Sequence, residues 1–227
     1  MFKLLLSILF PAFCLNCKKF GKYICTNCRT HLLPFEKQIC FYCEKESFLG
    51  LTHKECQKEN GVDQFITIFH YNNVLKKIIA GIKYRLVSDA FGELFELINN
   101  SFPQTSFHRD ISVQPIPLHT LRYRQRGFNQ SELIAKWIAA KTGGVMTDYL
   151  VRTKETKPQA QLKKEDRVLN AQSAFALKKG QKQPNLSLVE VVLVDDVVTT
   201  GSTTASATAV LKAAGARKVT VFSIAKD

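Results

Sequence analysis

Residues 191–204 (VVLVDDVVTTGSTT) contain two apolar runs with an acidic pair between them, and a hydroxyl-rich turn follows the second run. The first run is continuous and β-branched, which predicts a buried strand of a parallel sheet. Asp195 and Asp196 follow this run, and open α/β sheets bind ligands at the carboxyl ends of their strands. The turn leads into a predicted helix, 204–214, whose N-terminus offers backbone N–H groups to an anion. These residues predict a phosphate site that also presents two carboxylates.

Two common phosphate motifs do not fit this stretch. No Gly-Lys-Ser/Thr follows the glycine, which excludes a Walker A loop, and the three spaced glycines of the dinucleotide fingerprint are missing. The stretch instead resembles the signature with which type I phosphoribosyltransferases bind 5-phosphoribosyl-1-diphosphate (PRPP). The resemblance implies that the catalytic-site pair Asp195 and Asp196 faces the ribose hydroxyls and that the loop wraps the 5′-phosphate. The implied PRPP-binding residues are Asp195, Asp196, Val198, Thr199, Thr200, Gly201, Ser202 and Thr203. An ordinary strand, turn and helix is the alternative.

All seven cysteines fall between residues 14 and 56, and six of them form C-x-x-C pairs. A histidine and the seventh cysteine have the same spacing, so eight candidate ligands are present, enough for two tetrahedral zinc sites. In chain order the sites are Cys14, Cys17, Cys25 and Cys28, then Cys40, Cys43, His53 and Cys56. An interleaved pairing and a single filled site stay open, and His53 as a plain surface histidine is the alternative to its role as a ligand. A disulfide framework is the other interpretation, but seven is an odd number of cysteines, no secretion signal is present, and adjacent C-x-x-C pairs suit a metal better.

Strands and helices alternate along the rest of the chain, which predicts an α/β domain with a doubly wound parallel sheet. The predicted strands cover 63–71, 111–116, 144–151, 173–177, 188–194 and 218–224, and the predicted helices cover 74–85, 86–99, 131–143 and 204–214. Residues 120–129 and 152–172 are predicted loops. We therefore divide the chain into an N-terminal arm with a zinc-binding module, 1–60, and an α/β domain, 61–227.

The net charge of +13 is unevenly distributed. Residues 1–60 carry nine basic and five acidic side chains, and residues 152–185 carry nine and three. A clustered basic excess favours a polyanionic partner, with a generally basic surface as the alternative. Single-stranded DNA is bound by positive grooves with stacking aromatic rings. The basic candidates are Lys18, Lys19, Lys22, Arg122, Arg124, Arg126, Lys163 and Lys164. The aromatic candidates are Phe13, Phe20, Tyr23, Phe41, Tyr42, Phe48, Tyr123 and Phe128, with core packing as their alternative role.

The chain opens with an apolar arm, MFKLLLSILFPAF. Its apolar run is short, a single lysine precedes it and no small-x-small cleavage site follows, so we do not expect a signal peptide. We expect the arm to pack on the body of the protein, with contact to a membrane surface as the alternative. The expected location is the cytoplasm, with peripheral attachment at the inner face of the cytoplasmic membrane if the arm binds lipid. No run of the chain approaches the length of a bilayer-spanning helix.

Four motifs together resemble the ComF family of competence proteins. They are the repeated C-x-x-C pairs, R-x-R-x-R-G-F-N-Q at 122–130, TKPQ-x-QL-x(4)-R-x(2)-N-A at 156–171, and the PRPP signature. The resemblance covers essentially the whole chain and departs locally. His53 stands where a cysteine would complete the second zinc site, and Ser202 replaces a second glycine of the PRPP loop. The resemblance implies a type I phosphoribosyltransferase fold and a role in handling incoming single-stranded DNA during natural transformation.

The resemblance also implies where the pyrophosphate of PRPP binds. In that fold the turn at 115–119 is the pyrophosphate loop, and residues 152–170 are placed to cover the site, with a solvated charged loop as the alternative. Mg²⁺ would bridge the ribose diol and the pyrophosphate. The candidates for this part of the site are Pro117, His119, Arg122, Arg126, Lys157, Gln159 and Arg167.

The sequence thus predicts a DNA-uptake protein that binds PRPP with Mg²⁺ and handles single-stranded DNA, with a helicase or the uptake machinery as further partners. Two alternatives stay open. One is a salvage phosphoribosyltransferase that acts on a nucleobase, and the other is a PRPP-sensing regulator without catalysis. No acceptor base can be named from the sequence, so a transfer reaction is not part of the prediction.

Overall fold

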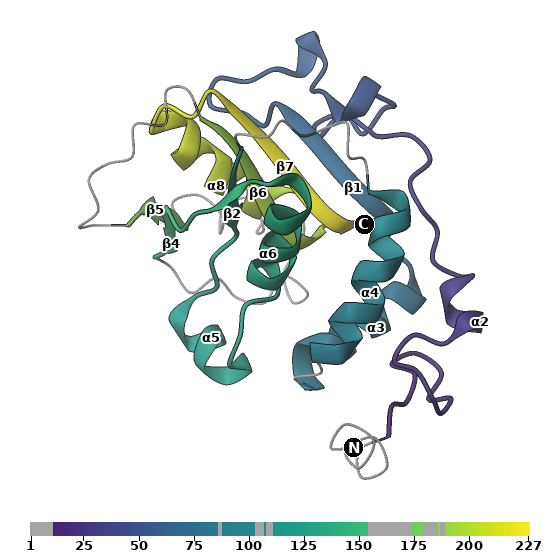
Figure 1. Ribbon diagram of the computed structural model, residues 1–227. Coiled ribbons are helices and arrows are strands. Elements are labelled where there is room, and N and C mark those ends of the chain that lie inside the picture. Colours follow the sequence, from purple (N-terminus) through teal and green to yellow (C-terminus); the bar gives the residue numbers. More distant parts are fainter. Residues whose placement is uncertain are drawn as a thin grey trace.

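The computed structural model of the protein describes residues 11–85, 88–102, 107, 111–153, 174–178, 186 and 189–227. Strands and helices alternate through most of this chain (Figure 1). The strands are β1 (Gln64–His70), β2 (Ile111–Pro115), β3 (Val145–Met146), β4 (Leu150–Arg152), β5 (Phe175–Leu177), β6 (Glu190–Val198) and β7 (Lys218–Lys226). The helices are α2 (Thr26–Arg29), α3 (Asn73–Arg85), α4 (Ser88–Ser101), α5 (Thr120–Arg126), α6 (Gln130–Thr142) and α8 (Ser202–Ala213), with short 3₁₀ turns η1 (Phe48–Gly50) and η2 (Lys54–Cys56).

Five strands form a parallel sheet in the order β1-β7-β6-β2-β3, which confirms the predicted α/β class. From β6 the chain crosses to β7 on one side, and from β2 it crosses to β3 on the other. The direction of winding therefore reverses between β6 and β2. Ligands of open parallel sheets bind in the crevice at this reversal, beyond the carboxyl ends of the strands. The topology thus places a binding crevice at the end of β6, and it is consistent with a type I phosphoribosyltransferase fold.

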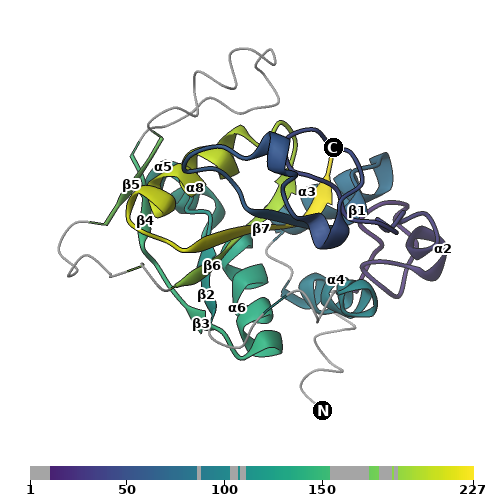
Figure 2. The same cartoon turned by 90° about the horizontal axis from the view of Figure 1, so that it is seen from above.

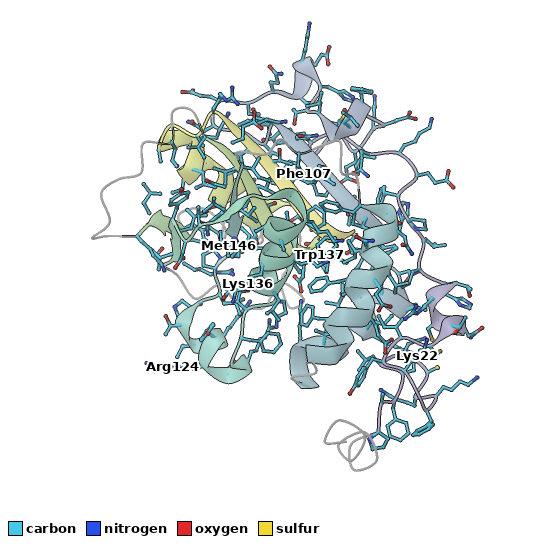
Figure 3. The ribbon with its side chains drawn as sticks, in the orientation of Figure 1. Lys22, Phe107, Arg124, Lys136, Trp137 and Met146 are labelled. Atoms are coloured by element: carbon cyan, nitrogen blue, oxygen red, sulfur yellow. The ribbon has the colours of Figure 1, made fainter. Side chains whose placement is uncertain are left out.

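Helices cover both faces of the sheet (Figure 2). Helices α3, α4 and α6 pack on one face, where Val192 and Val194 of β6 join their apolar cluster. Helix α8 packs on the other face, against Val191 and Leu193. Because successive side chains of a strand point to opposite faces, the continuous valine run of β6 fills both layers. Trp137 of α6 (labelled in Figure 3) stacks on Phe95 of α4 with ring centroids 5.3 Å apart, which fastens these two helices together.

The structure differs from the sequence prediction in two places. Residues 120–126 form the helix α5 and not a loop, with the His119 side chain accepting a hydrogen bond from the Leu121 N–H and Gly127 ending the helix at a φ of 74°. The single strand predicted over 144–151 is split, since β3 belongs to the parallel sheet whereas β4 pairs antiparallel with β5. The Tyr149 N–H binds the Gln114 side chain, at 2.7 Å, where the chain leaves the main sheet.

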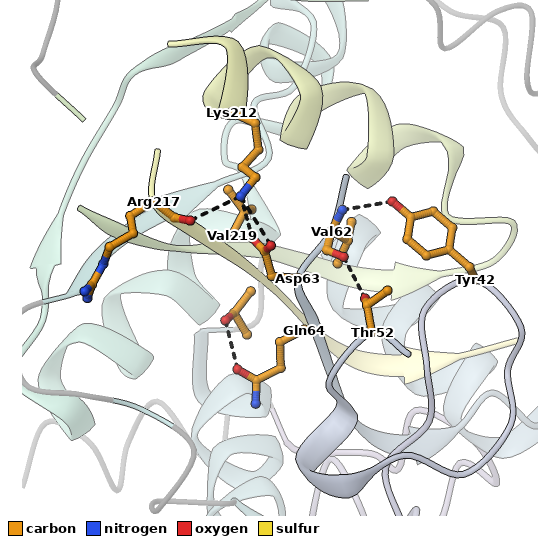
Figure 4. A network of polar contacts seen from close by, with 9 residues as sticks. Tyr42, Thr52, Val62, Asp63, Gln64, Lys212, Arg217 and Val219 are labelled. Atoms are coloured by element: carbon orange, nitrogen blue, oxygen red, sulfur yellow. Dashed lines mark hydrogen bonds and ion pairs between the residues drawn. The ribbon is translucent and has the colours of Figure 1, made fainter. Parts of the chain in front are cut away.

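The cysteine-containing segment runs along the free edge of β1 and contacts both layers of the domain. The Phe35 N–H donates to the Ile68 carbonyl and the His70 N–H to the Leu33 carbonyl, each at 2.8 Å, so part of this edge is paired. Leu15 lies so close to α3 that a Cβ at Gly81 would come within 2.9 Å of it. Figure 4 shows polar contacts at the other end of the segment, where the Tyr42 hydroxyl accepts from the Val62 N–H. Among the described residues, no helix combines the length and the apolar character needed to cross a bilayer.

Candidate functional site

A polar cleft of about 660 Å³ lies at the reversal of the winding, beyond the ends of β6 and β2. Asp195 and Asp196 line the cleft, and so do five cationic side chains from α3, α5 and β4. These cations are Lys76, Lys83, Arg122, Arg126 and Arg152. A cleft with this excess of positive charge attracts an anionic ligand, and its two carboxylates can accept hydrogen bonds from hydroxyl groups.

The two carboxylates of the acidic pair have different partners, as expected for neighbours on a strand. Asp196 forms an ion pair with Lys83 of α3, and its other oxygen accepts from the Val197 N–H at 2.9 Å. Burial alone would lower the pKa of Lys83, but the charge and hydrogen bond of Asp196, together with the charge of Asp195, outweigh burial and raise it. Lys83 is therefore held as a cation inside the cleft.

Asp195 accepts hydrogen bonds from the Ser131 hydroxyl at 3.1 Å and from the Asp196 N–H at 2.9 Å. Burial and the negative charge of Asp196 raise the pKa of Asp195 to about 7. Near neutral pH this carboxyl consequently changes between a proton donor and an acceptor. A ligand that donates hydroxyl hydrogen bonds would favour the ionised form.

Replacing Asp195 by asparagine tests this pKa. A carboxyl whose pKa is raised by folding stabilises the fold at low pH, and that stabilisation is lost as the pH rises through the folded-state pKa, here about 7. We therefore expect Asp195→Asn to gain about 2 kcal/mol in unfolding free energy over wild type between pH 5 and pH 8. Denaturant unfolding at the two pH values measures this. Asp148→Asn, at a carboxylate that is 63% exposed, is the matched control and should show no such gain. An unchanged difference between the two pH values for Asp195→Asn would contradict the assignment.

The hydroxyl-rich loop after β6 leads directly into α8. Gly201 precedes the helix with a φ of 74°, a left-handed conformation that suits glycine. The Thr204 hydroxyl donates to the Gly201 carbonyl at 3.0 Å, and the Ser202 N–H donates to the Thr200 hydroxyl at 3.4 Å. The first N–H groups of a helix have no partner within the helix and point out from its start. A hollow of about 20 Å³ at this point shares Asp195, Thr199 and Thr203 with the large cleft. The loop can therefore bind a phosphate whose attached group extends into the cleft.

The structure distributes the predicted PRPP-binding residues between these two spaces. The residues that line the cleft or the hollow are Asp195, Asp196, Val198, Thr199, Gly201, Ser202 and Thr203. Thr200 lines neither, and its hydroxyl lies 3.1 Å from that of Ser202. Thr200 therefore shapes the turn and does not line the space for a ligand.

The R-G-F-N-Q segment joins α5 to α6 and fastens both to the sheet. Phe128 packs edge-to-face on Phe91 of α4, with ring centroids 6.3 Å apart. The Asn129 side chain caps α6 by accepting from the Ser131 N–H, and it donates to the Ile116 carbonyl at 2.9 Å. One side chain thus fixes the start of α6 and the turn after β2, which form opposite sides of the cleft.

Gln130 is the buried polar residue of this segment, and its side chain lines the cleft while only 3% of it is exposed. Its Oε1 accepts from Arg126 at 3.2 Å, whereas its Nε2 has no acceptor within the described part of the chain. A buried donor without an acceptor costs free energy unless a ligand or water supplies one. This donor fits an oxygen-rich ligand such as a sugar phosphate.

The predicted pyrophosphate candidates separate in the structure. Arg122 and Arg126 lie four residues apart on one face of α5 and line the cleft. His119 caps α5, and the residues that line the cleft from this turn are Ile116 and Leu118, not Pro117. Lys157, Gln159 and Arg167 lie outside the described residues.

The eight predicted zinc ligands form two groups in chain order. The first is Cys14, Cys17, Cys25 and Cys28, and the second is Cys40, Cys43, His53 and Cys56. Within each group the candidate ligand atoms all lie within 4.8 Å of one another. The structure thus brings together the sequential sets, His53 included, and not an interleaved pairing.

The backbone around each group fits a metal-bound thiolate. Two turns have the same pattern, in which Lys18 N–H donates to the Cys14 carbonyl and Glu44 N–H to the Cys40 carbonyl, both at 2.9 Å. Burial raises the pKa of Cys14, but backbone N–H groups outweigh it and lower the pKa to about 6. The same balance lowers the pKa of Cys40 to about 7. Each group therefore contains a thiol that ionises readily, as zinc binding requires, and these residues fit a structural Zn²⁺.

The predicted DNA-binding residues also separate. Lys18, Lys19 and Lys22 are exposed on the first cysteine turn, beside Phe13 and Phe20, whose rings meet edge-to-face at 5.9 Å. Phe20 is 71% exposed, so this turn presents an aromatic ring among lysines. We call these five residues the knuckle surface.

The remaining candidates lie elsewhere or pack inside. Arg124 points outward from α5, and in Figure 3 it lies across the lower edge of the molecule from Lys22, with α3 and α4 between them. Of the other aromatic candidates, Phe48 and Tyr123 are exposed, at 79% and 47%. Those packed against the buried clusters are Tyr23, Phe41, Tyr42 and Phe128. Lys163 and Lys164 are outside the described residues.

Several residues of the cleft were not predicted as site residues from the sequence, among them Lys83, Gln130, Ser131 and Arg152. Lys83 is one of several lysines on its helix, so its sequence does not distinguish it from Lys76 or Lys77. Gln130 ends the R-G-F-N-Q segment and Ser131 follows it, so this motif was the sequence signal that could have identified both residues. Arg152 enters the cleft because β4 leaves the main sheet, and no local pattern predicts that departure.

Comparison with known proteins finds no matching family model, but it finds relatives along most of the chain. The chain is 25% identical to Competence protein F of Haemophilus influenzae, over 91% of this chain and 98% of that protein. It is 24% identical to Competence protein ComFC of Bacillus subtilis, over 79% and 74% of the two chains. It is 26% identical to DNA utilization protein YhgH of Escherichia coli, over 89% and 96%.

Proposed function

Since the chain belongs to the ComF family of competence proteins, we propose that it takes part in DNA uptake, where it binds PRPP with Mg²⁺ and handles incoming single-stranded DNA. The observation that carries the PRPP part is the arrangement at the end of β6. There a carboxylate pair and a loop at the N-terminus of α8 open into one cationic cleft. A phosphorylated ribose needs both features close together, because its phosphate and its hydroxyl groups belong to the same sugar.

Each part of the cleft has a role in this proposal. The loop from Thr199 to Thr203 and the start of α8 bind the 5′-phosphate. Asp195 and Asp196 accept hydrogen bonds from the ribose hydroxyls, and Arg122 and Arg126 bind the pyrophosphate. Mg²⁺, when bound, would neutralise part of the pyrophosphate charge. Lys83 holds Asp196 in place through their ion pair.

The DNA part of the proposal is supported by the names of the relatives, competence and DNA utilization proteins, and by the knuckle surface. An exposed ring among lysines suits a single strand, whose bases stack on aromatic rings while its phosphates pair with cations. The knuckle surface is built on the first cysteine group, away from the cleft residues. We therefore propose that DNA and PRPP bind at different places, in a protein that acts in the cytoplasm, with peripheral membrane contact and a helicase or the uptake machinery as further partners.

Two binding measurements test the proposal. Wild type is expected to bind PRPP in the presence of Mg²⁺, measured by calorimetry. It is also expected to bind an unstructured oligonucleotide with an affinity that falls steeply as salt is added. The absence of DNA binding at low salt would contradict the DNA part. Release of pyrophosphate from PRPP that depends on an added nucleobase would instead support a salvage enzyme.

A charge-removing variant locates the DNA surface. We expect Lys19→Gln/Lys22→Gln to weaken oligonucleotide binding about tenfold at low salt and to reduce the salt slope by about 1.4, because two phosphate contacts are lost. The control is Lys136→Gln/Lys141→Gln, which removes two exposed lysines from α6. Equal effects of the two variants would show that the knuckle surface has no special role and that binding follows net charge alone.

A further inference from the structure

An aromatic ring from the second cysteine group lies directly against the glycine of the phosphate loop. If Gly201 carried a Cβ, that atom would be 2.5 Å from Cζ of Phe41 and 3.1 Å from its Cε2. Carbon atoms in proteins do not approach this closely, so the ring occupies the space that a side chain at residue 201 would need. The phosphate loop therefore rests on Phe41.

The ring of Phe41 is fixed by its surroundings. It meets Phe65 of β1 edge-to-face, with ring centroids 5.5 Å apart, and Tyr42 in the same way at 5.1 Å. Tyr42 is in turn held through its hydroxyl, which accepts from the Val62 N–H at 2.9 Å, and the Thr52 hydroxyl donates to the Val62 carbonyl at 2.6 Å (Figure 4). The support under Gly201 is thus continuous with the chain that leads into β1.

The same turn also contacts the strand end beside the phosphate loop. Phe41 lies between Cys40 and Cys43, the two thiols that this turn contributes to the second group. Glu44, the next residue, forms an ion pair with Lys226 at 3.0 Å, and only 8% of the Lys226 side chain is exposed. Lys226 ends β7 opposite Val198, which ends β6 just before the loop. One turn of the cysteine segment therefore contacts both the loop itself and the strand end beside it.

We propose that the second cysteine group is a positioning element for the phosphate loop, with Phe41 as the residue through which it acts. A metal ion bound by Cys40, Cys43, His53 and Cys56 fixes the turn, the turn fixes Phe41, and Phe41 holds Gly201 and the start of α8 in the conformation that presents their N–H groups. This inference rests on the proposed phosphate site and adds that the state of the second metal group controls its affinity.

The two cysteine groups differ in a way that suits this role. In the first group Cys14, Cys25 and Cys28 are buried and one ligand, Cys17, is exposed. In the second group only Cys40 is buried, and Cys43, His53 and Cys56 are partly exposed. The second group is thus the more accessible to chelators and oxidants. Its metal would exchange first, and the phosphate loop would respond.

The first test replaces the ring in the zinc-loaded full chain. We expect Phe41→Ala to weaken PRPP binding about tenfold by calorimetry while the bound zinc, measured by colorimetric release, stays at the wild-type level. Phe41→Leu should restore most of the affinity, because it keeps an apolar group against Gly201. Phe48→Ala, at an exposed ring of the same segment, is the control and should bind as wild type. Wild-type affinity in Phe41→Ala would overturn the inference.

A double-mutant cycle tests the contact itself. Gly201→Ala places a methyl group against the Phe41 ring, and Phe41→Ala removes the obstacle. The left-handed backbone at residue 201 costs the same in both backgrounds, so it cancels in the cycle. We expect Gly201→Ala to lose less affinity in the Phe41→Ala background than in wild type. Equal losses would show that the contact does not position the loop.

A third measurement needs no ligand and separates this inference from the PRPP proposal. We expect amide hydrogen exchange in residues 199–205 of the unliganded protein to become faster in Phe41→Ala and in Cys43→Ala/His53→Ala, with no further increase when the three changes are combined. Exchange that stays at the wild-type rate in these variants overturns the inference. Wild-type protein that fails to bind PRPP overturns only the proposed function.

Discussion

Asp195→Ala/Asp196→Ala is expected to weaken PRPP binding by at least about 100-fold, because each carboxylate that accepts a ligand hydroxyl contributes about 1.5–3 kcal/mol. The variant removes two neighbouring carboxylates that repel each other, as the pKa of about 7 for Asp195 indicates, but it also removes the partner of Lys83, so circular dichroism checks that the variant is folded. Calorimetry with PRPP and Mg²⁺ measures the loss. Asp148→Ala, at an exposed carboxylate, is the control and should bind normally.

The same variant also tells whether the PRPP site is needed for DNA uptake. DNA affinity is expected to change little, because the knuckle surface does not include the cleft residues. If transformation is lost together with PRPP binding, the site is required. If transformation survives while PRPP binding is lost, the DNA surface carries the function and the PRPP site serves another purpose.

Cys14→Ser/Cys28→Ser is expected to unfold the first cysteine group and to lower the zinc content by one ion per chain relative to wild type. These buried thiols pack with Cys25 and one partly buried valine, Val74, so little apolar packing is available to replace the metal. Structural zinc contributes on the order of 10 kcal/mol to such small modules. Colorimetric zinc release and limited proteolysis of residues 12–32 measure the effect.

The matched control is His31→Ala, at an exposed side chain of the same segment that is not a candidate ligand. It should keep the zinc content of the wild type and resist proteolysis. Contacts of Glu93 link the segment to α4, since Glu93 accepts from the Tyr23 and Ile24 N–H groups, at 3.1 and 2.8 Å, and pairs with Arg29 at 3.5 Å. If they held the segment without metal, the double variant would resist proteolysis as well, and the structural role of the zinc would be refuted.

Elements with a strong local pattern could be predicted from the sequence. The apolar faces of α3 and α6 repeat with the period of a helix, and the run that forms β6 is short, continuous and β-branched, which favours a buried strand. Helix α5 (TLRYRQR) has no continuous apolar face, because its arginines alternate with a tyrosine and a glutamine. It forms because His119 and Gly127 cap its two ends, and a cap acts through geometry that residue types alone do not specify.

The candidate site was predictable where its residues are neighbours in the sequence. The two carboxylates toward the end of β6 and the glycine before α8 lie in one short stretch of sequence, so the sequence itself indicates the chemistry they can carry out. Lys83 meets Asp196 across more than a hundred residues, and Arg152 reaches the cleft only because β4 turns away from β3. Such contacts depend on how the elements pack, and nothing in the sequence around either residue indicates them.

The sequence by itself determined the α/β class, the acidic pair with its phosphate loop, and the eight residues that can bind metal, because each of these is a short pattern with one physical solution. Only the tertiary structure decided which cysteines share a group, which cations enter the cleft, and that Phe41 supports Gly201. These are long-range contacts, whose partners come together through the winding of the sheet and the path of the cysteine segment along β1. The local properties of the residues leave those partners open.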